Sequence, residues 1–228
     1  MNKSDIKKMK NLIATTQSGL SWEVNKIPTS DFHHYAIFSD PQSKIHNIHV
    51  PIKQYPSESN DLMAYLHELC HATLAETVNP QFASTFFHPE TDADLILAIT
   101  PQFQVAKEWF VDAHLNKICP NLFRKEIQVD LSNILEALKH NKPENFAFSN
   151  RYIVGLLFAE ASKWLHAPIA TDGIYSRIID ALLDVDPNNP TLSALEFLTN
   201  KLLALETNLQ LNAVYFDTHK TELFTIQI

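Results

Sequence analysis

The spacing of apolar residues predicts one helix and then three strands in the first part of the chain. Residues 4–17 have helical spacing, with Ser4 as the candidate N-cap. Apolar and polar positions then alternate in short stretches, which is typical of β-strands. Residues 40–43 are turn-forming and predict a hairpin between the second and third strands. The predicted strands are 20–27, 35–38 and 45–52.

Beyond Pro56 the apolar period becomes helical. We expect a helix capped by Ser59 or Asn60. It should end near Asn79, because Pro80 disfavours helix in the residue before it. The apolar positions of this helix are Leu62, Leu66, Leu69 and Thr73.

Helices are predicted for most of the remaining chain. After a less regular segment at 80–99, Thr100 followed by Pro101 predicts the start of a helix that runs to about residue 118. Alternating residues near the C-terminus predict a hairpin around 218–220. The other predicted helices are 124–140, 149–166, 171–184 and 190–208.

Composition narrows the classes of function. The 228 residues have a formal net charge of −8 and no basic stripe, which argues against binding nucleic acid. The chain has only three glycines, which excludes a glycine-rich phosphate loop. The most apolar run, 153–159, is too short to cross a membrane, and the first residues lack the apolar stretch of a signal peptide. We therefore expect a cytoplasmic protein that binds neither nucleic acid nor membrane.

Residues 67–71 read HELCH, which matches the HExxH pattern of zinc enzymes. His67 and His71 are one helical turn apart, so both imidazoles can reach one Zn²⁺. Glu68, at the adjacent position, is the candidate general base that takes a proton from water. We expect Cys70 to be a buried free thiol and not a ligand. The alternative is a chance match, with two histidines on the surface of an ordinary helix.

A catalytic zinc site needs a third protein ligand. Glu108 is the preferred candidate, because it lies in another predicted helix four residues before Asp112, and this spacing puts both carboxylates on one helix face. Asp112 would then hydrogen-bond the far nitrogen of a ligating histidine and fix its tautomer. Asp112 itself, His114 and His88 are the alternative third ligands.

The combination of HExxH with a downstream glutamate in an ExxxD context resembles the zincin metallopeptidases of the gluzincin type. His67, Glu68 and His71 match the first motif, and Glu108 with Asp112 matches the second. The chain also resembles, more loosely, the ImmA/IrrE-type metallopeptidases. These resemblances imply a zincin-like fold, one Zn²⁺ as the cofactor and a peptide or protein as the substrate.

The resemblance covers roughly residues 30–120 and implies two further elements of the site. The strand at 45–52 would be the edge strand along which an extended substrate binds. Gluzincins also add a Tyr or His that stabilises the oxyanion. The candidates for this role are Tyr152, His166 and Tyr175.

Together these observations predict an α+β, zincin-like protein, with a small N-terminal β-sheet and active-site helix followed by a helix-rich C-terminal part. We expect a single domain over residues 1–228, with the sheet and metal-binding helices in 1–120 and a helical block in 121–228. The predicted function is zinc-dependent hydrolysis of peptide bonds. Two alternatives stay open: a zinc hydrolase that acts on a non-peptide amide, and a helical interaction protein whose metal site is structural.

Overall fold

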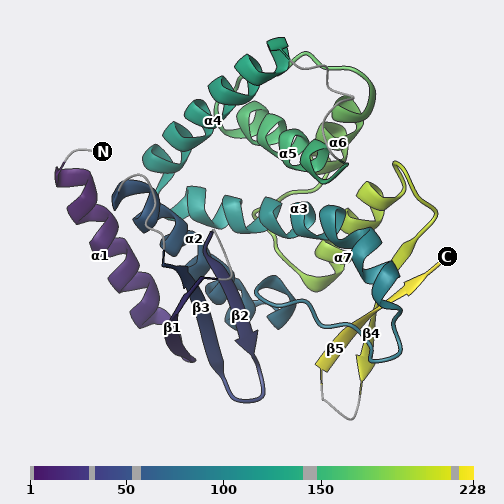
Figure 1. Cartoon of the computed structure of the whole chain (residues 1–228), viewed down its shortest axis with the longest axis horizontal. Coiled ribbons are helices and arrows are strands. Elements are labelled where there is room, and N and C mark those ends of the chain that lie inside the picture. The colour runs from purple at the N-terminus through teal and green to yellow at the C-terminus, as the bar shows by residue number, and fades with distance from the viewer. Residues whose placement is uncertain (1–2, 31–33, 53–57, 141–147, 217–220) are drawn as a thin grey trace. The chain divides into compact units, whose positions relative to one another are not determined.

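The computed structural model describes residues 3–30, 34–52, 58–140, 148–216 and 221–228. They form an α+β arrangement, as predicted, with helices α1 to α7 and two small sheets (Figure 1). The chain divides into two compact units, Met1–Thr85 and Phe86–Ile228, which are called the first and second unit below. The single domain expected over 1–228 stays a prediction.

The first unit contains a three-stranded sheet in the order β1-β3-β2. The strands are β1 (Glu23–Thr29), β2 (Ala36–Asp40) and β3 (Ile45–Pro51). β3 pairs with β1 in parallel and with β2 in the predicted antiparallel hairpin. β3 is therefore the central strand, and the prediction that 45–52 forms the edge strand is wrong. Alternation within one strand identifies its buried face but not its neighbours, and here β1 occupies the side that the hairpin leaves open.

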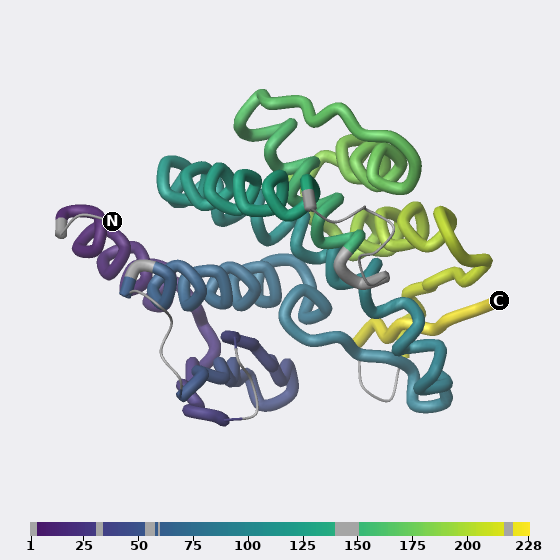
Figure 2. The backbone as a smooth tube through the Cα atoms, turned by 45° about the horizontal axis from the view of Figure 1, so that its top comes forward, coloured from purple at the N-terminus to yellow at the C-terminus, as the bar shows by residue number. Residues whose placement is uncertain are grey.

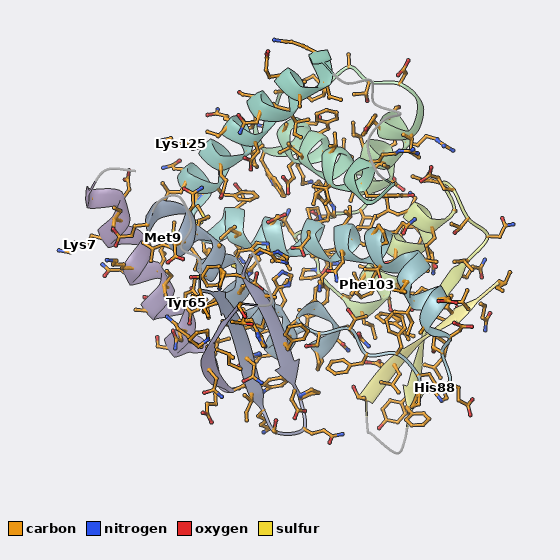
Figure 3. All side chains as sticks on the ribbon, viewed as in Figure 1. Lys7, Met9, Tyr65, His88, Phe103 and Lys125 are labelled. Atoms are coloured by element: carbon orange, nitrogen blue, oxygen red, sulfur yellow. The ribbon has the colours of Figure 1, made fainter. Side chains whose placement is uncertain are left out.

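Two helices complete most of the first unit. α1 (Lys3–Gly19) packs beside α2 (Glu58–Thr77), and the 3₁₀ helix η1 (Pro80–Phe82) follows α2 directly (Figure 1). Figure 3 labels two residues of α1: Met9 is fully buried, whereas Lys7 is exposed. This difference within one helix is the amphipathic pattern that a surface helix needs.

α2 lies against the sheet through a stripe of apolar side chains. Tyr65, Leu69 and Ala72 belong to the same buried cluster as Ile37 of β2 and Ile48 of β3. Their spacing of four and three residues keeps them on one side of the helix. The sheet therefore fixes which side of α2 is turned toward it and which side is left for other contacts.

In the second unit, α3 (Ala93–Ile118) packs against three other helices (Figure 2). It begins well before the predicted start at Thr100–Pro101, because the side chain of Asp92 accepts a hydrogen bond from the Asp94 amide and caps the helix there. Pro101 lies inside α3, where it cannot donate to the carbonyl of Leu97. Leu97 is 70% exposed, so this turn of the helix faces solvent, where water can satisfy the carbonyl.

The four other predicted helices are confirmed, with ends that differ by a few residues. The C-terminal hairpin is also confirmed, although its predicted turn at 218–220 lies outside the described residues. Within the described part of the chain, no helix combines the length and apolar character needed to span a membrane. The elements are α4 (Pro120–His140), α5 (Phe148–Trp164), α6 (Gly173–Leu183), α7 (Leu192–Leu203), β4 (Gln210–Phe216) and β5 (Thr221–Gln227).

Candidate metal centre

The two histidines of the HELCH motif lie on the side of α2 that faces away from the sheet. His67 and His71 each follow a sheet-facing residue, Tyr65 or Leu69, by two positions. Two positions rotate a side chain by about 200° around a helix, which is close to the opposite side. The apolar pattern of α2 thus dictates the direction of both imidazoles.

His71 is held in one orientation by a backbone carbonyl. Its ring is buried, with 3% of the residue exposed, and its Nδ1 lies 2.7 Å from the carbonyl oxygen of Phe82. A carbonyl only accepts, so Nδ1 must carry the proton and donate it. In the neutral ring the lone pair is then on Nε2, and this is the tautomer that metal-ligating histidines commonly adopt.

His67 lies next to His71 and is more accessible. The two rings meet edge to face, with centroids 4.9 Å apart and an angle of 86° between their planes. The side chain of His67 is 25% exposed, and its Nδ1 lies 3.7 Å from Oε1 of Glu68. Glu68 itself is buried. The motif therefore places two imidazoles and one buried carboxylate on consecutive turns of one helix.

Glu108 supplies a third donor. His67, His71 and Glu108 each offer one ligand atom, and these three atoms all lie within 4.8 Å of one another. The three residues form a group that could hold a metal ion. Two imidazole nitrogens and one carboxylate oxygen are a donor set that zinc accepts, and three protein ligands leave a coordination position open.

The other residues proposed for the third position do not belong to this group within the described residues. The Nδ1 of His88 accepts from the amide of Glu90 at 3.3 Å, and its ring lies against Phe216. Burial, together with the charge of Lys117, lowers the pKa of His114. Asp112 is one helical turn from Glu108 on α3 and is buried.

Asp112 was predicted to accept a hydrogen bond from a ligating histidine. For one of the two histidines, a different acceptor is found. For His71 the acceptor is the Phe82 carbonyl, which the sequence did not identify. A role of Asp112 toward His67 stays a prediction. Cys70 is buried and is not part of a disulfide, as expected.

The three candidates for oxyanion stabilisation lie in the second unit. Tyr152 is fully buried, and its hydroxyl donates to Oε2 of Glu206 at 3.0 Å. Burial raises the pKa of Tyr152 and of Tyr175. His166 is exposed and has a φ of 54° at the C-terminal end of α5, which is the left-handed conformation of many helix ends. Oxyanion stabilisation stays a prediction for all three side chains.

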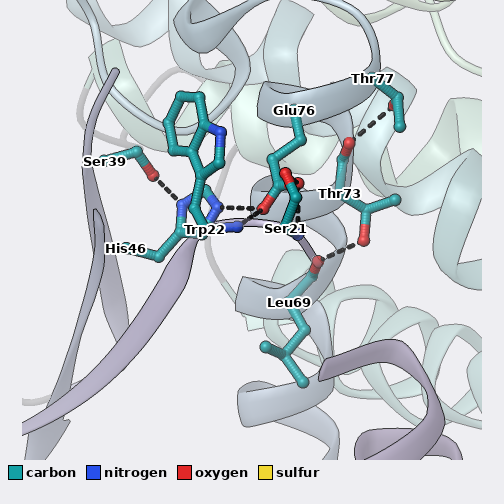
Figure 4. A network of polar contacts seen from close by, with 8 residues as sticks. All are labelled: Ser21, Trp22, Ser39, His46, Leu69, Thr73, Glu76 and Thr77. Carbon is teal, nitrogen blue, oxygen red and sulfur yellow. Dashed lines mark hydrogen bonds and ion pairs between the residues drawn. The ribbon is translucent and has the colours of Figure 1, made fainter. Parts of the chain in front are cut away.

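A second buried histidine of the first unit, His46 of β3, belongs to a hydrogen-bond network that the sequence did not predict (Figure 4). Its Nδ1 lies 2.6 Å from Oγ of Ser39, and its Nε2 lies 3.1 Å from Oε1 of Glu76 on α2. Glu76 also accepts from the amide of Trp22, whose indole stacks on the His46 ring with a centroid distance of 4.9 Å. The amide and hydroxyl of Ser21 donate to the same carboxylate. This network ties α2 to the sheet.

Comparison with known proteins adds no relative: no protein-family model, no curated protein and no solved structure matches the chain. The function is therefore inferred from the geometry of the site.

Proposed function

We propose that the chain is a zinc-dependent peptidase of zincin-like architecture, with His67, His71 and Glu108 as the metal ligands and Glu68 as the general base. One observation carries the proposal: the donor atoms of these three residues lie within 4.8 Å of one another. An HExxH helix alone is a pattern of sequence, whereas a third donor grouped with both histidines is what an open zinc site requires.

The tautomer of His71 adds to this argument. The hydrogen bond to the Phe82 carbonyl keeps the Nδ1 proton in place and leaves the Nε2 lone pair for a cation. Zinc, when bound with an open position, supplies Lewis acidity and lowers the pKa of water to about 7.

The surroundings of Glu68 support its proposed role as the group that takes a proton from water. It is buried, it adjoins His67 in the sequence, and one of its oxygens lies 3.7 Å from that ring. A carboxylate at this position would take the proton from the attacking water and pass it to the leaving amine. Positioned acid–base groups contribute factors of about 10² to 10⁴ in rate. The choice of a peptide as substrate rests on the gluzincin resemblance of HExxH with Glu108 and Asp112.

Zinc content tests the metal centre. The wild type, purified without added metal, should contain about one zinc per chain by elemental analysis, because the described residues contain one such group of three donors. His71→Ala and Glu108→Ala should each lose it. His166→Asn is the matched control, because it removes an exposed imidazole and asparagine tolerates the positive φ at that position.

A wild type that contains no zinc, even after dialysis against the metal, would overturn the proposal. Zinc that is lost in His71→Ala but kept in Glu108→Ala would assign the third ligand to another residue. For the activity, zinc-loaded protein should cleave members of a mixed peptide library, and Glu68→Gln should keep its zinc while losing at least about 10²-fold in rate. Cleavage that is equal in both proteins would rule out Glu68 as the base.

A further inference from the structure

The turn that follows α2 determines where the Phe82 carbonyl lies. Asn79 is the residue that organises this turn. Its backbone amide donates to the Leu74 carbonyl at 3.1 Å and so ends the helix. Its side-chain Oδ1 accepts from the amide of Gln81 at 3.0 Å, and its carbonyl accepts from the amide of Phe82 at 3.1 Å. Asn79 thus fixes both the start of η1 and the peptide unit before the Phe82 carbonyl.

The residues around Asn79 give the turn few other ways to satisfy its polar groups. Gln81 is 1% exposed and Phe82 is fully buried, so water cannot easily replace the cap at the Gln81 amide. Without the side-chain oxygen of Asn79 as its acceptor, the amide of Gln81 would have to turn toward another partner. The Phe82 carbonyl belongs to the next residue along the chain and would move with it.

We propose that Asn79 is a positioning residue for the metal ligand His71. By capping η1 it holds the Phe82 carbonyl at hydrogen-bond distance from Nδ1 of His71, and so it fixes the tautomer that offers Nε2 to the metal. This inference rests on the proposed function, because it assigns Asn79 a role at the same site. Asn79 itself does not belong to the donor group.

The metal affinity of Asn79→Ala is the first test. Loss of a group that orients a ligating histidine typically weakens metal binding by about 10- to 100-fold. We expect a loss of this size for Zn²⁺, measured by competition with a chromogenic chelator, and a changed absorption spectrum for Co²⁺. Asn79→Asp keeps the acceptor oxygen and should bind both metals as the wild type does. Thr191→Ala is the matched control, since it removes an N-cap of the same kind from α7.

A second measurement separates the positioning role from the metal site. In the metal-free protein, ¹⁵N chemical shifts of the His71 ring should report one tautomer, with the proton on Nδ1, in the wild type and in Asn79→Asp. In Asn79→Ala they should report a mixture. Equal zinc affinity and an unchanged tautomer in Asn79→Ala would overturn the inference. A wild type that binds no zinc but shows the tautomer change in Asn79→Ala would overturn the proposed function and leave the positioning role standing.

Discussion

His46 and His71 are buried histidines of the same unit, and they differ in what their ring nitrogens meet. In His46 both nitrogens contact side chains, Ser39 on one side and Glu76 on the other. In His71 one nitrogen donates to a backbone carbonyl. His71 also belongs to the group of possible metal ligands with His67 and Glu108. The first arrangement makes the histidine a structural link, whereas the second fits the proposed role of a metal ligand.

The charge around His46 agrees with a structural role. Burial lowers the pKa of His46, and this effect outweighs the hydrogen bond and the charge of Glu76, which raise it. The ring is then neutral near pH 7, with Nε2 donating to Glu76 and Nδ1 accepting from the Ser39 hydroxyl. Burial by itself would raise the pKa of Glu76, but hydrogen bonds from Ser21, Trp22 and His46 outweigh it and the pKa is lowered. A neutral histidine beside an ionised carboxylate uses all of its hydrogen-bonding capacity within the protein.

The largest expected difference between the two histidines is in the effect of metal removal on stability. A ligand that binds only the folded state adds about 4 kcal/mol to the free energy of unfolding at 1,000 times its Kd. We expect Zn²⁺ to stabilise the wild type by this order, measured by chemical denaturation with and without a chelator. His71→Ala should abolish the difference, and His46→Gln should keep it, because glutamine can donate to Glu76 and accept from Ser39 as the neutral ring does. Equal zinc stabilisation in His71→Ala would contradict the assignment of this ligand.

His46→Ala should have the next largest effect, and on stability alone. It removes a hydrogen bond to a carboxylate whose side chain is 9% exposed, and it also removes the ring against which Trp22 stacks. Hydrogen bonds to charged groups contribute about 1.5 to 3 kcal/mol, so we expect a loss of roughly 2 to 3 kcal/mol in the free energy of unfolding. The zinc content per folded chain should stay as in the wild type. A variant of normal stability that fails to bind zinc would instead make His46 part of the metal site.

The pH dependence of stability should show the neutral state of His46. Its pKa in the folded protein lies below the ordinary value of 6.5, so below pH 6.5 the unfolded chain takes up a proton that the folded chain does not. The free energy of unfolding should therefore fall from pH 6.5 downward until the folded pKa is reached. Glu76 contributes in a lower range, because its pKa is lowered from 4.5 and its stabilisation is lost as the pH falls through the folded value.

Denaturation curves of the metal-free protein between pH 7 and 4 would measure both ranges. His46→Gln should reduce the loss of stability in the upper range and leave the lower range unchanged; the part that remains in the upper range belongs to His114, whose pKa burial also lowers. A wild type whose stability rises as the pH drops below 6.5 would mean that His46 is protonated in the folded state, contrary to its assignment as a neutral link.

The two histidines also show what the sequence could and could not predict. The HExxH spacing predicted the orientation of His71 and His67, because helical periodicity converts a spacing of four residues directly into a shared face. The acceptor of His71 was not predictable in this way. It is a backbone carbonyl, and every residue has one, so no residue type at position 82 marks it. The same holds for His46, whose partner Glu76 is distant in sequence and has no characteristic spacing from it.

Errors in the predicted fold have a similar origin. The strand at 45–52 was identified correctly, but pairing partners follow from the path of the whole chain, and β1 made β3 a central strand. For α3, Thr100 with Pro101 has the local signature of a helix start, yet the cap at Asp92 begins the helix earlier and the proline is tolerated inside it. In both cases local signals identified the kind of element correctly. The neighbours of β3 were decided by pairing with a distant strand, and the start of α3 was decided by a competing cap.

Ser84→Ala should have the smallest effect, and it tests whether the surroundings of the two histidines are connected. The amide of Ser39 donates to Oγ of Ser84 at 2.6 Å, while the hydroxyl of Ser39 contacts His46. Ser84 also ends the turn that presents the Phe82 carbonyl, because its own amide donates to the Pro80 carbonyl. Hydrogen bonds lead from Glu76 through both strands of the hairpin to Ser84. From Ser84 the backbone of the turn leads to the Phe82 carbonyl and so to His71, which means that the path begins and ends on α2.

Removing the Ser84 hydroxyl leaves the nearly buried amide of Ser39 without its acceptor, which should cost about 1 kcal/mol in the free energy of unfolding. The effect on zinc affinity should be smaller than that of Asn79→Ala, because the hydrogen bonds to the Pro80 carbonyl still close the turn. Ser84→Thr keeps the hydroxyl and is the control; chemical denaturation and chelator competition measure the two quantities. Ser84→Ala could instead weaken zinc binding more than Asn79→Ala does. In that case the hydrogen bond between Ser84 and Ser39 of β2, and not the cap of η1, would hold the Phe82 carbonyl against His71.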